Sequence, residues 1–152
     1  MVHHAEVLLA LFDAVAARSI VEVGAYAGDL TRVLIDWAAG TGATVMAVDP
    51  SPQPSLVELA GEHAGLELVR RTSLEALPDI ALPDVLIIDG DHNYYTVREE
   101  LRIVGERDGR ALPLLLFHDV SWPHARRDDY FDAVQIPAEF SHPVIGDGAG
   151  IF

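Results

Sequence analysis

The sequence predicts a single-domain α/β protein built on a parallel β-sheet with crossover helices. Short apolar runs alternate with amphipathic stretches along roughly the first 120 residues, which is the pattern of strand–helix–strand units. The chain has 152 residues, a size that suits one domain. Hydrophobic residues make up 50% of it, which supplies a core and argues against disorder.

Five strands are expected, each a short apolar run that ends at a polar residue or a turn. They cover residues 19–23, 44–49, 66–70, 85–89 and 114–119. The segment "PSPQP" ends the second strand firmly, because proline cannot donate to a strand ladder. The run "VLII", residues 85–88, is apolar throughout and indicates a strand buried on both faces.

Amphipathic stretches between these strands predict the helices. They cover residues 4–17, 29–38 and 55–61, and one more helix follows the fourth strand. In the first helix the apolar spacing predicts one core-facing side, made of Leu8, Leu11, Phe12 and Val15. In the last helix we expect Val97, Leu101 and Val104 to face the core, and the charged residues to lie mostly outside: Arg98, Glu99, Glu100 and Arg102.

The pattern changes after Val120. Residues 121–152 contain three prolines and many charges but no convincing strand. The segment is too long for an ordinary loop, so it is expected to be an irregular lid, a wrapping tail or an interface.

Composition excludes several classes of function. The chain has no Cys, which removes thiolate nucleophiles and Cys-based zinc or iron–sulfur sites. It has no Lys either, since all ten basic residues are Arg, so P-loop and Schiff-base chemistry are disfavoured. A net charge of −14 repels nucleic acid and anionic membranes. With no apolar run of about 20 residues and no signal-peptide pattern, we expect a cytoplasmic protein.

Polar residues collect where the predicted strands end. The five ends carry Glu22 and Gly24, Asp49, Thr72 and Ser73, the group Asp89 to His92, and the pair His118 and Asp119. One acid at a strand end is usually a turn residue or a helix cap. Because ligands bind at the carboxyl ends of parallel strands, five such ends on one edge favour a binding site.

The first turn suggests the ligand. Its spacing, Glu22-x-Gly24-x-x-x-Gly28, differs from the dinucleotide pattern G-x-G-x-x-G. Carboxylates at Glu22 and Asp29 oppose a pyrophosphate and suit an ammonium or sulfonium group. Asp49 closes the next strand, where an acid accepts hydrogen bonds from ribose hydroxyls. Adenosine with a cationic amino-acid tail describes S-adenosylmethionine.

Several segments, taken in order, resemble the successive motifs of class I S-adenosylmethionine-dependent methyltransferases: "VEVGAYAGDLT", "VMAVDPSP", "RRTSLEAL", "VLIIDGDHNYYTVREEL" and "LLLFHDV". The likeness covers residues 18–120 and is strongest to the small-molecule branch with "DGDH" and "HD". It implies a Rossmann-like, doubly wound parallel sheet of strand order 3-2-1-4-5 with helices on both faces. The implied activity is O-methylation of a small metabolite.

The resemblance also assigns site residues. The cofactor would contact Glu22, Gly24, Ala25, Tyr26, Gly28, Asp49, Pro50, Ser73, Leu74 and Asp89. Glu22, Gly24 and Gly28 would line its methionine part, and Ser73 and Leu74 would flank adenine. For Ser73, the alternative of a helix N-cap stays open.

The ends of the fourth and fifth strands leave the catalytic chemistry open. In one version, which the resemblance implies, a divalent metal, Mg²⁺ or a softer ion, would be bound by Asp89, His118 and Asp119 and would lower the pKa of the acceptor hydroxyl. In the metal-free version His92 or His118 is the general base, and Asp89 is a further candidate catalytic residue. In a third version neither applies, and Asp91 or Asn93 only caps the next helix.

Two rival functions remain. One is a non-catalytic S-adenosylmethionine-binding module, regulatory or part of a complex. The family normally adds two more strands, which we do not find in residues 121–152, and this favours the module, whereas the polar ends of the fourth and fifth strands disfavour it. The other is a nicotinamide-dependent oxidoreductase, which the acidic first turn opposes. An uncovered edge at the fifth strand predicts a homodimer.

Overall fold

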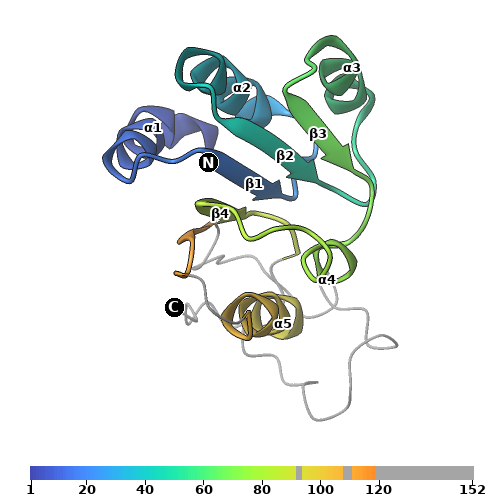
Figure 1. Ribbon diagram of the computed structural model, residues 1–152. Helices are drawn as coiled ribbons and strands as arrows, with labels where there is room; N and C mark the ends of the chain where they lie inside the picture. Colours follow the sequence, from blue (N-terminus) through green and yellow to red (C-terminus); the bar gives the residue numbers. More distant parts are fainter. Residues whose placement is uncertain (92–93, 108–110, 119–152) are drawn as a thin grey trace.

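The computed structural model describes residues 1–91, 94–107 and 111–118, which form a five-stranded sheet with helices on both faces (Figure 1). The strands are β1 Ser19–Val23, β2 Thr44–Val48, β3 Leu66–Val69, β4 Val85–Ile88 and β5 Leu114–Phe117. Their order is β3-β2-β1-β4-β5, and every neighbouring pair is parallel. The predicted fold class and strand order are therefore confirmed.

The helices are η1 Val2–His4, α1 Ala5–Ala14, α2 Asp29–Thr41, α3 Pro54–Glu62, α4 Ser73–Ala76 and α5 Tyr94–Gly105. Helix α1 is shorter than predicted, because Ala16 adopts a left-handed φ of 51° that no helix continues. Helix α2 is longer and stops at Gly42, which takes the left-handed conformation that ends many helices. The short helix α4 was not among the predicted elements.

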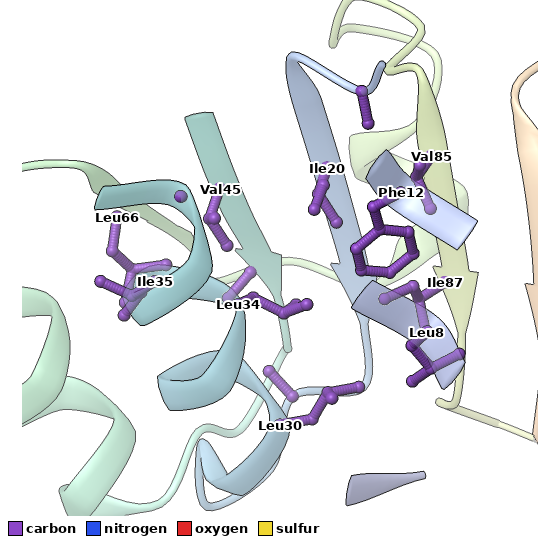
Figure 2. Close-up of a cluster of buried hydrophobic side chains, with 14 of the residues drawn as sticks. Leu8, Phe12, Ile20, Leu30, Leu34, Ile35, Val45, Leu66, Val85 and Ile87 are labelled. Atoms are coloured by element: carbon purple, nitrogen blue, oxygen red, sulfur yellow. The ribbon is translucent and has the colours of Figure 1, made fainter. Parts of the chain in front are cut away.

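One face of the sheet is covered by α1, α2 and α3 (Figure 1). Figure 2 shows Phe12 of α1 among Ile20, Val85 and Ile87 of the two central strands. Leu8 and Phe12 are buried as predicted, but Leu11 and Val15 are 39% and 48% exposed. Their prediction as core residues was wrong, because α1 packs on the sheet along a narrow stripe.

The opposite face is covered by α4 and α5. Side chains alternate along a strand, so the residues next to Ile20 and Ile87 point the other way. They pack with α4 and α5 in a second cluster, which contains Val21, Val23, Val48, Ala76, Leu77, Leu86, Ile88 and Val104. The prediction of helices on both faces is confirmed.

The carboxyl ends of the strands meet on one edge, as predicted. Beyond β1 and β4 the ladder continues, since Asp89 N–H donates to the Val23 carbonyl at 3.0 Å and His118 N–H donates to the Ile88 carbonyl at 3.1 Å. Strand β1 ends as expected, β2, β3 and β4 end one residue earlier and β5 ends two residues earlier, so Asp49, Asp89 and His118 stand just past their strands.

Within the described ranges, no helix is both long and apolar enough to cross a membrane. The predicted tail, residues 121–152, lies outside them.

Candidate functional site

The turn between β1 and α2 lies directly against the end of β4. Gly24 has a φ of 82°, and a Cβ atom there would stand 2.4 Å from both the Asp89 carbonyl oxygen and the Gly90 Cα. A side chain at this position would collide with backbone, which cannot move aside cheaply. Glycine is therefore required, and it brings two of the predicted motifs into backbone contact.

Asp49 holds the same turn from the β2 side. One carboxylate oxygen accepts the Tyr26 N–H at 2.7 Å, and the other accepts the Ser51 N–H at 2.8 Å. Tyr26 has a left-handed φ of 47°, which is strained for a residue with a side chain. Each oxygen of a carboxylate has two lone pairs, so one on each remains for ribose hydroxyls. Asp49 thus has the geometry to fix the turn and bind ribose together.

The remaining residues of this turn differ in exposure. Ala25 is buried, whereas the Tyr26 side chain and Pro50 are exposed. Gly28, with a φ of 85°, packs on α3: a Cβ there would lie 3.2 Å from a Leu56 methyl carbon. The structure therefore gives Gly28 a packing role between α2 and α3.

Glu22 lies on the face of the sheet covered by α2 and is 2% exposed. The pKa of its carboxyl is raised to about 7, chiefly by burial and to a smaller extent by the charges of Asp89 and Asp49, while the hydrogen bond from Thr31 and the amino group of Met1 lower it. That bond runs from the Thr31 hydroxyl to one Glu22 oxygen at 2.6 Å. Near neutral pH, Glu22 therefore exchanges between a neutral and a charged form behind the glycine turn.

Asp89 and His118 meet at the ends of β4 and β5. Asp89 Oδ1 is 2.8 Å from His118 Nδ1, with the N–H direction off the ideal hydrogen-bond line. The amino group of Met1 donates to His118 Nε2 at 3.0 Å, so this nitrogen serves as an acceptor here. The arrangement suits the tautomer with its proton on Nδ1, held by Asp89, and a lone pair on Nε2.

The predicted metal site is described only in part. Asp89 and His118 lie together, but no group of three or more potential metal ligands occurs in the described ranges. Asp119, the third predicted ligand, and His92, the second candidate base, lie outside them. One carboxylate and one imidazole are too few to define a divalent site, so no chemical step is derived through a metal.

The adenine side of the predicted site lies at the β3–α4 turn. Thr72 is the N-cap of α4, and it exchanges hydrogen bonds with Glu75 in a capping box. The alternative reading of Ser73 as the N-cap was therefore wrong. Ser73 is the first helical residue and is 7% exposed, and Leu74 beside it is half-buried.

Sequence reasoning missed two buried polar residues near these turns. Thr31 lies on the buried side of α2 and is 0% exposed. Glu100 was expected outside, but it is also 0% exposed. The signal was present: Glu100 follows Val97 by three residues and precedes Val104 by four, which places it on the apolar side of α5.

A family model described as "Methyltransferase domain" matches residues 21–120. No curated protein sequence matches the chain.

Three solved structures share the fold. A protein assigned as a caffeoyl-CoA O-methyltransferase from Staphylococcus aureus aligns with a TM-score of 0.61 at 14% identity, over 90% of this chain and 65% of its own. Cofactor-bound Rv0187 from MTB aligns with a TM-score of 0.59 at 23% identity, over 80% of this chain and 57% of its own.

The third is NcsB1, an O-methyltransferase from neocarzinostatin biosynthesis in complex with S-adenosylmethionine and 2-hydroxy-5-methyl naphthoic acid. It aligns with a TM-score of 0.57 at 20% identity, over 77% of this chain and 38% of its own. The chain thus spans 38% to 65% of the length of these proteins. At such identities the likeness shows the fold.

Proposed function

The chain belongs to the methyltransferase domain family, and from this premise we propose that it transfers the methyl group of S-adenosylmethionine to an oxygen of a small molecule. The observation that carries the proposal is the backbone contact between Gly24 and the Asp89–Gly90 turn, beside the Asp89–His118 pair. It joins a candidate cofactor turn and a candidate proton acceptor at one edge of the sheet.

The residues at this edge fit the cofactor. Asp49 would accept hydrogen bonds from the ribose hydroxyls with its remaining lone pairs. Gly24 lets the β1–α2 turn lie against the end of β4, so the two segments proposed to contact the methionine part stand side by side, and Glu22 behind them would favour a positive charge when ionised. When bound, S-adenosylmethionine supplies an electrophilic methyl group on a sulfonium.

In the proposed reaction the acceptor hydroxyl displaces the Met1 amino group from His118 Nε2, and this nitrogen then takes the hydroxyl proton as the oxygen forms its bond to the methyl carbon. The sulfur–carbon bond breaks in the same step, and its electron pair stays on sulfur. Asp89 orients the imidazole and stabilises the imidazolium that forms. Holding the hydroxyl in line with the methyl group is the other contribution of the protein.

Binding of S-adenosylhomocysteine tests the cofactor assignment, with two aspartates as a matched pair. Asp49 and Asp84 each accept two backbone N–H groups, but Asp84 does so at the opposite edge, from Arg18 and Ser19 at 2.7 and 3.0 Å. Asp49→Asn should weaken binding in calorimetry by about tenfold or more, because a charge-assisted contact to ribose is lost. Asp84→Asn should leave the Kd unchanged. Equal losses in both variants, or binding of NAD instead, would contradict the proposal.

Turnover tests the role of His118. His118→Gln should lower the rate of S-adenosylhomocysteine formation, with a panel of phenols and alcohols as acceptors, by about a hundredfold or more. Its Kd for S-adenosylhomocysteine should stay unchanged, and His63→Gln, far along the chain at the end of α3, is the control.

Two other outcomes have a defined meaning. If His118→Gln keeps full turnover, and this turnover depends on added Mg²⁺ and is abolished by Asp119→Ala, the result would favour activation of the hydroxyl by a metal over a His118 base. Cofactor binding without turnover on any acceptor would favour the non-catalytic module.

The partner and assembly remain part of the proposal. We expect a small-molecule acceptor, because the net charge of −14 disfavours nucleic acid and anionic membranes as partners. We also expect a homodimer that covers the β5 edge of the sheet. A monomeric mass in light scattering at high concentration would contradict the dimer.

A further inference from the structure

Glu100 of α5 is a buried carboxyl that the proposed reaction does not use. Its side chain is 0% exposed, and neither carboxyl oxygen has a hydrogen-bond partner in the part of the chain that the structure describes. A buried polar group without a partner costs free energy, so its presence calls for a physical reason.

The groups that face Glu100 belong to two turns of the proposed cofactor site. The Ser73 hydroxyl, at the start of α4, lies close enough to lower the pKa of Glu100 without reaching hydrogen-bond geometry. The Asp91 carboxylate, past the end of β4, acts on Glu100 through its charge. Thr96 of α5 donates to Asp91 at 2.9 Å and ties this turn to the helix. Glu100 therefore stands between the β3–α4 turn and the β4 end.

We propose that Glu100 is a positioning residue of the cofactor site, which sets the direction of the Ser73 hydroxyl toward adenine. The inference rests on the proposed function, which assigns adenine to the turn at Ser73. Glu100 itself does not touch the cofactor, because it is fully buried behind Ser73 and acts through that hydroxyl.

The mechanism follows from the donors and acceptors of each group. A hydroxyl has one proton and two lone pairs. A small rotation of either side chain would bring a neutral Glu100 into hydrogen-bond geometry as a donor to Ser73 Oγ, so the Ser73 proton would be free to bond a ring nitrogen of adenine, which is an acceptor. An ionised Glu100 only accepts, so it draws the Ser73 proton inward and turns a lone pair toward the ring. The neutral form is therefore the one that binds adenine.

The charge state of Glu100 is poised in the physiological range. The pKa of its carboxyl is raised to about 7, chiefly by burial and to a smaller extent by the Asp91 charge, while the nearby Ser73 hydroxyl lowers it. Among the described residues, no cationic group contributes to this balance. Adenine binding should therefore weaken as the pH rises through about 7.

The test measures S-adenosylhomocysteine affinity by calorimetry at pH 6.0 and pH 8.5 in the wild type and in Glu100→Gln. The amide of Gln donates to Ser73 at any pH. The two proteins should bind alike at pH 6.0, whereas at pH 8.5 the variant should bind about tenfold to thirtyfold more tightly, since the ionised carboxyl outnumbers the neutral form by that order. Glu22 titrates in the same range in both proteins, so the ratio of the two Kd values isolates Glu100.

Controls separate this role from a merely structural one. Glu106→Gln changes an exposed carboxyl near the end of α5, paired with Arg102 at 2.6 Å, and should follow the wild type at both pH values. If Glu100→Gln does not fold, Ser73→Ala provides the same test, since without the hydroxyl the pH dependence of binding should shrink by the same factor.

A Kd ratio that stays constant between the two pH values, or an undiminished pH dependence in Ser73→Ala, would overturn the inference while leaving the proposed function intact. A wild type that binds no S-adenosylhomocysteine at either pH would overturn both.

Discussion

Glu22 and Glu100 are buried carboxyls on opposite faces of the same sheet, and they are held differently. Both are almost fully buried, and burial raises the pKa of each to about 7. Glu22 accepts a short hydrogen bond from Thr31 at 2.6 Å. The Glu100 oxygens have no hydrogen-bond partner in the described part of the chain.

The difference shows that burial is the main cause of the raised pKa of both carboxyls, whereas the hydrogen-bond partner decides whether the carboxyl group is held in one orientation. At Glu22 the hydrogen bond fixes one oxygen, and the neighbouring charges of Asp49 and Asp89 are part of the site itself. At Glu100 the nearest hydroxyl belongs to Ser73, which the proposed function assigns to the cofactor. Glu22 is held by a hydrogen bond from α2, whereas Glu100 lies beside a residue that is proposed to bind the cofactor.

The change expected to have the largest effect disrupts the turn that follows Glu22. In Gly24→Ala, two residues beyond Glu22, the new Cβ would stand 2.4 Å from backbone atoms of Asp89 and Gly90. The β1 and β4 ends would have to separate, so cofactor binding should fall below detection in calorimetry. Urea unfolding should show a loss well beyond the roughly 1–2 kcal/mol that a left-handed Ala costs by itself.

Gly42→Ala is the matched control, because Gly42 also has a positive φ, of 72°, but nothing lies within 4 Å of its added Cβ. It should lose only about 1–2 kcal/mol and bind S-adenosylhomocysteine normally. Similar losses of unfolding free energy and binding in both variants would mean that the contact between the turns is not the reason why residue 24 must be glycine.

A second prediction compares the two carboxyls through the pH dependence of stability. Each pKa is raised from 4.5 to about 7, so the folded state binds these protons more tightly than the unfolded state. Their contribution is fully present below pH 4.5 and is lost as the pH rises through about 7. Each carboxyl should cost at most about 3 kcal/mol of unfolding free energy at pH 8 relative to pH 4.

Glu22→Gln should remove its share of this loss in urea unfolding at the two pH values. The repulsion of other charges is common to both proteins, so the difference between variant and wild type isolates Glu22. An identical loss in the two proteins would mean that Glu22 does not titrate in this range.

The smallest expected effect concerns the partner of Glu22. Thr31→Val keeps the shape of the side chain but removes the hydrogen bond to Glu22, which should cost about 1–2 kcal/mol. This bond lowers the pKa of Glu22, so its loss should raise that pKa. The loss of unfolding free energy caused by Thr31→Val should therefore be larger at pH 8 than at pH 5.

Thr41→Val, on the same helix, removes only hydroxyl contacts to the Trp37 and Ala38 carbonyls at 3.3 and 3.4 Å. Its cost should be the same at both pH values. A pH-independent cost for Thr31→Val as well would show that Glu22 does not change its charge state in this range.

Much of the fold was predictable because it follows from local pattern. The apolar runs predicted all five strands, the resemblance of the motifs predicted the order of the sheet, and the strand ends predicted Asp49, Asp89 and His118 on one edge. Boundaries were less accurate where a single backbone angle decides them. The φ of 51° at Ala16 and the capping box of Thr72 with Glu75 depend on atoms that the hydrophobic pattern does not describe.

The sequence by itself determined the parallel strands and the residue types that gather at their carboxyl edge, because strand period, breakers and crossover connections are local properties, and the strand order followed from the resemblance of its motifs. Only the tertiary structure decided the Thr31 bond to Glu22 and the 2.8 Å approach of Asp89 to His118. These depend on which helix covers which face and on distances between segments far apart in sequence. A carboxyl has the same chemistry in every sequence, and its surroundings in the fold set its pKa and its role.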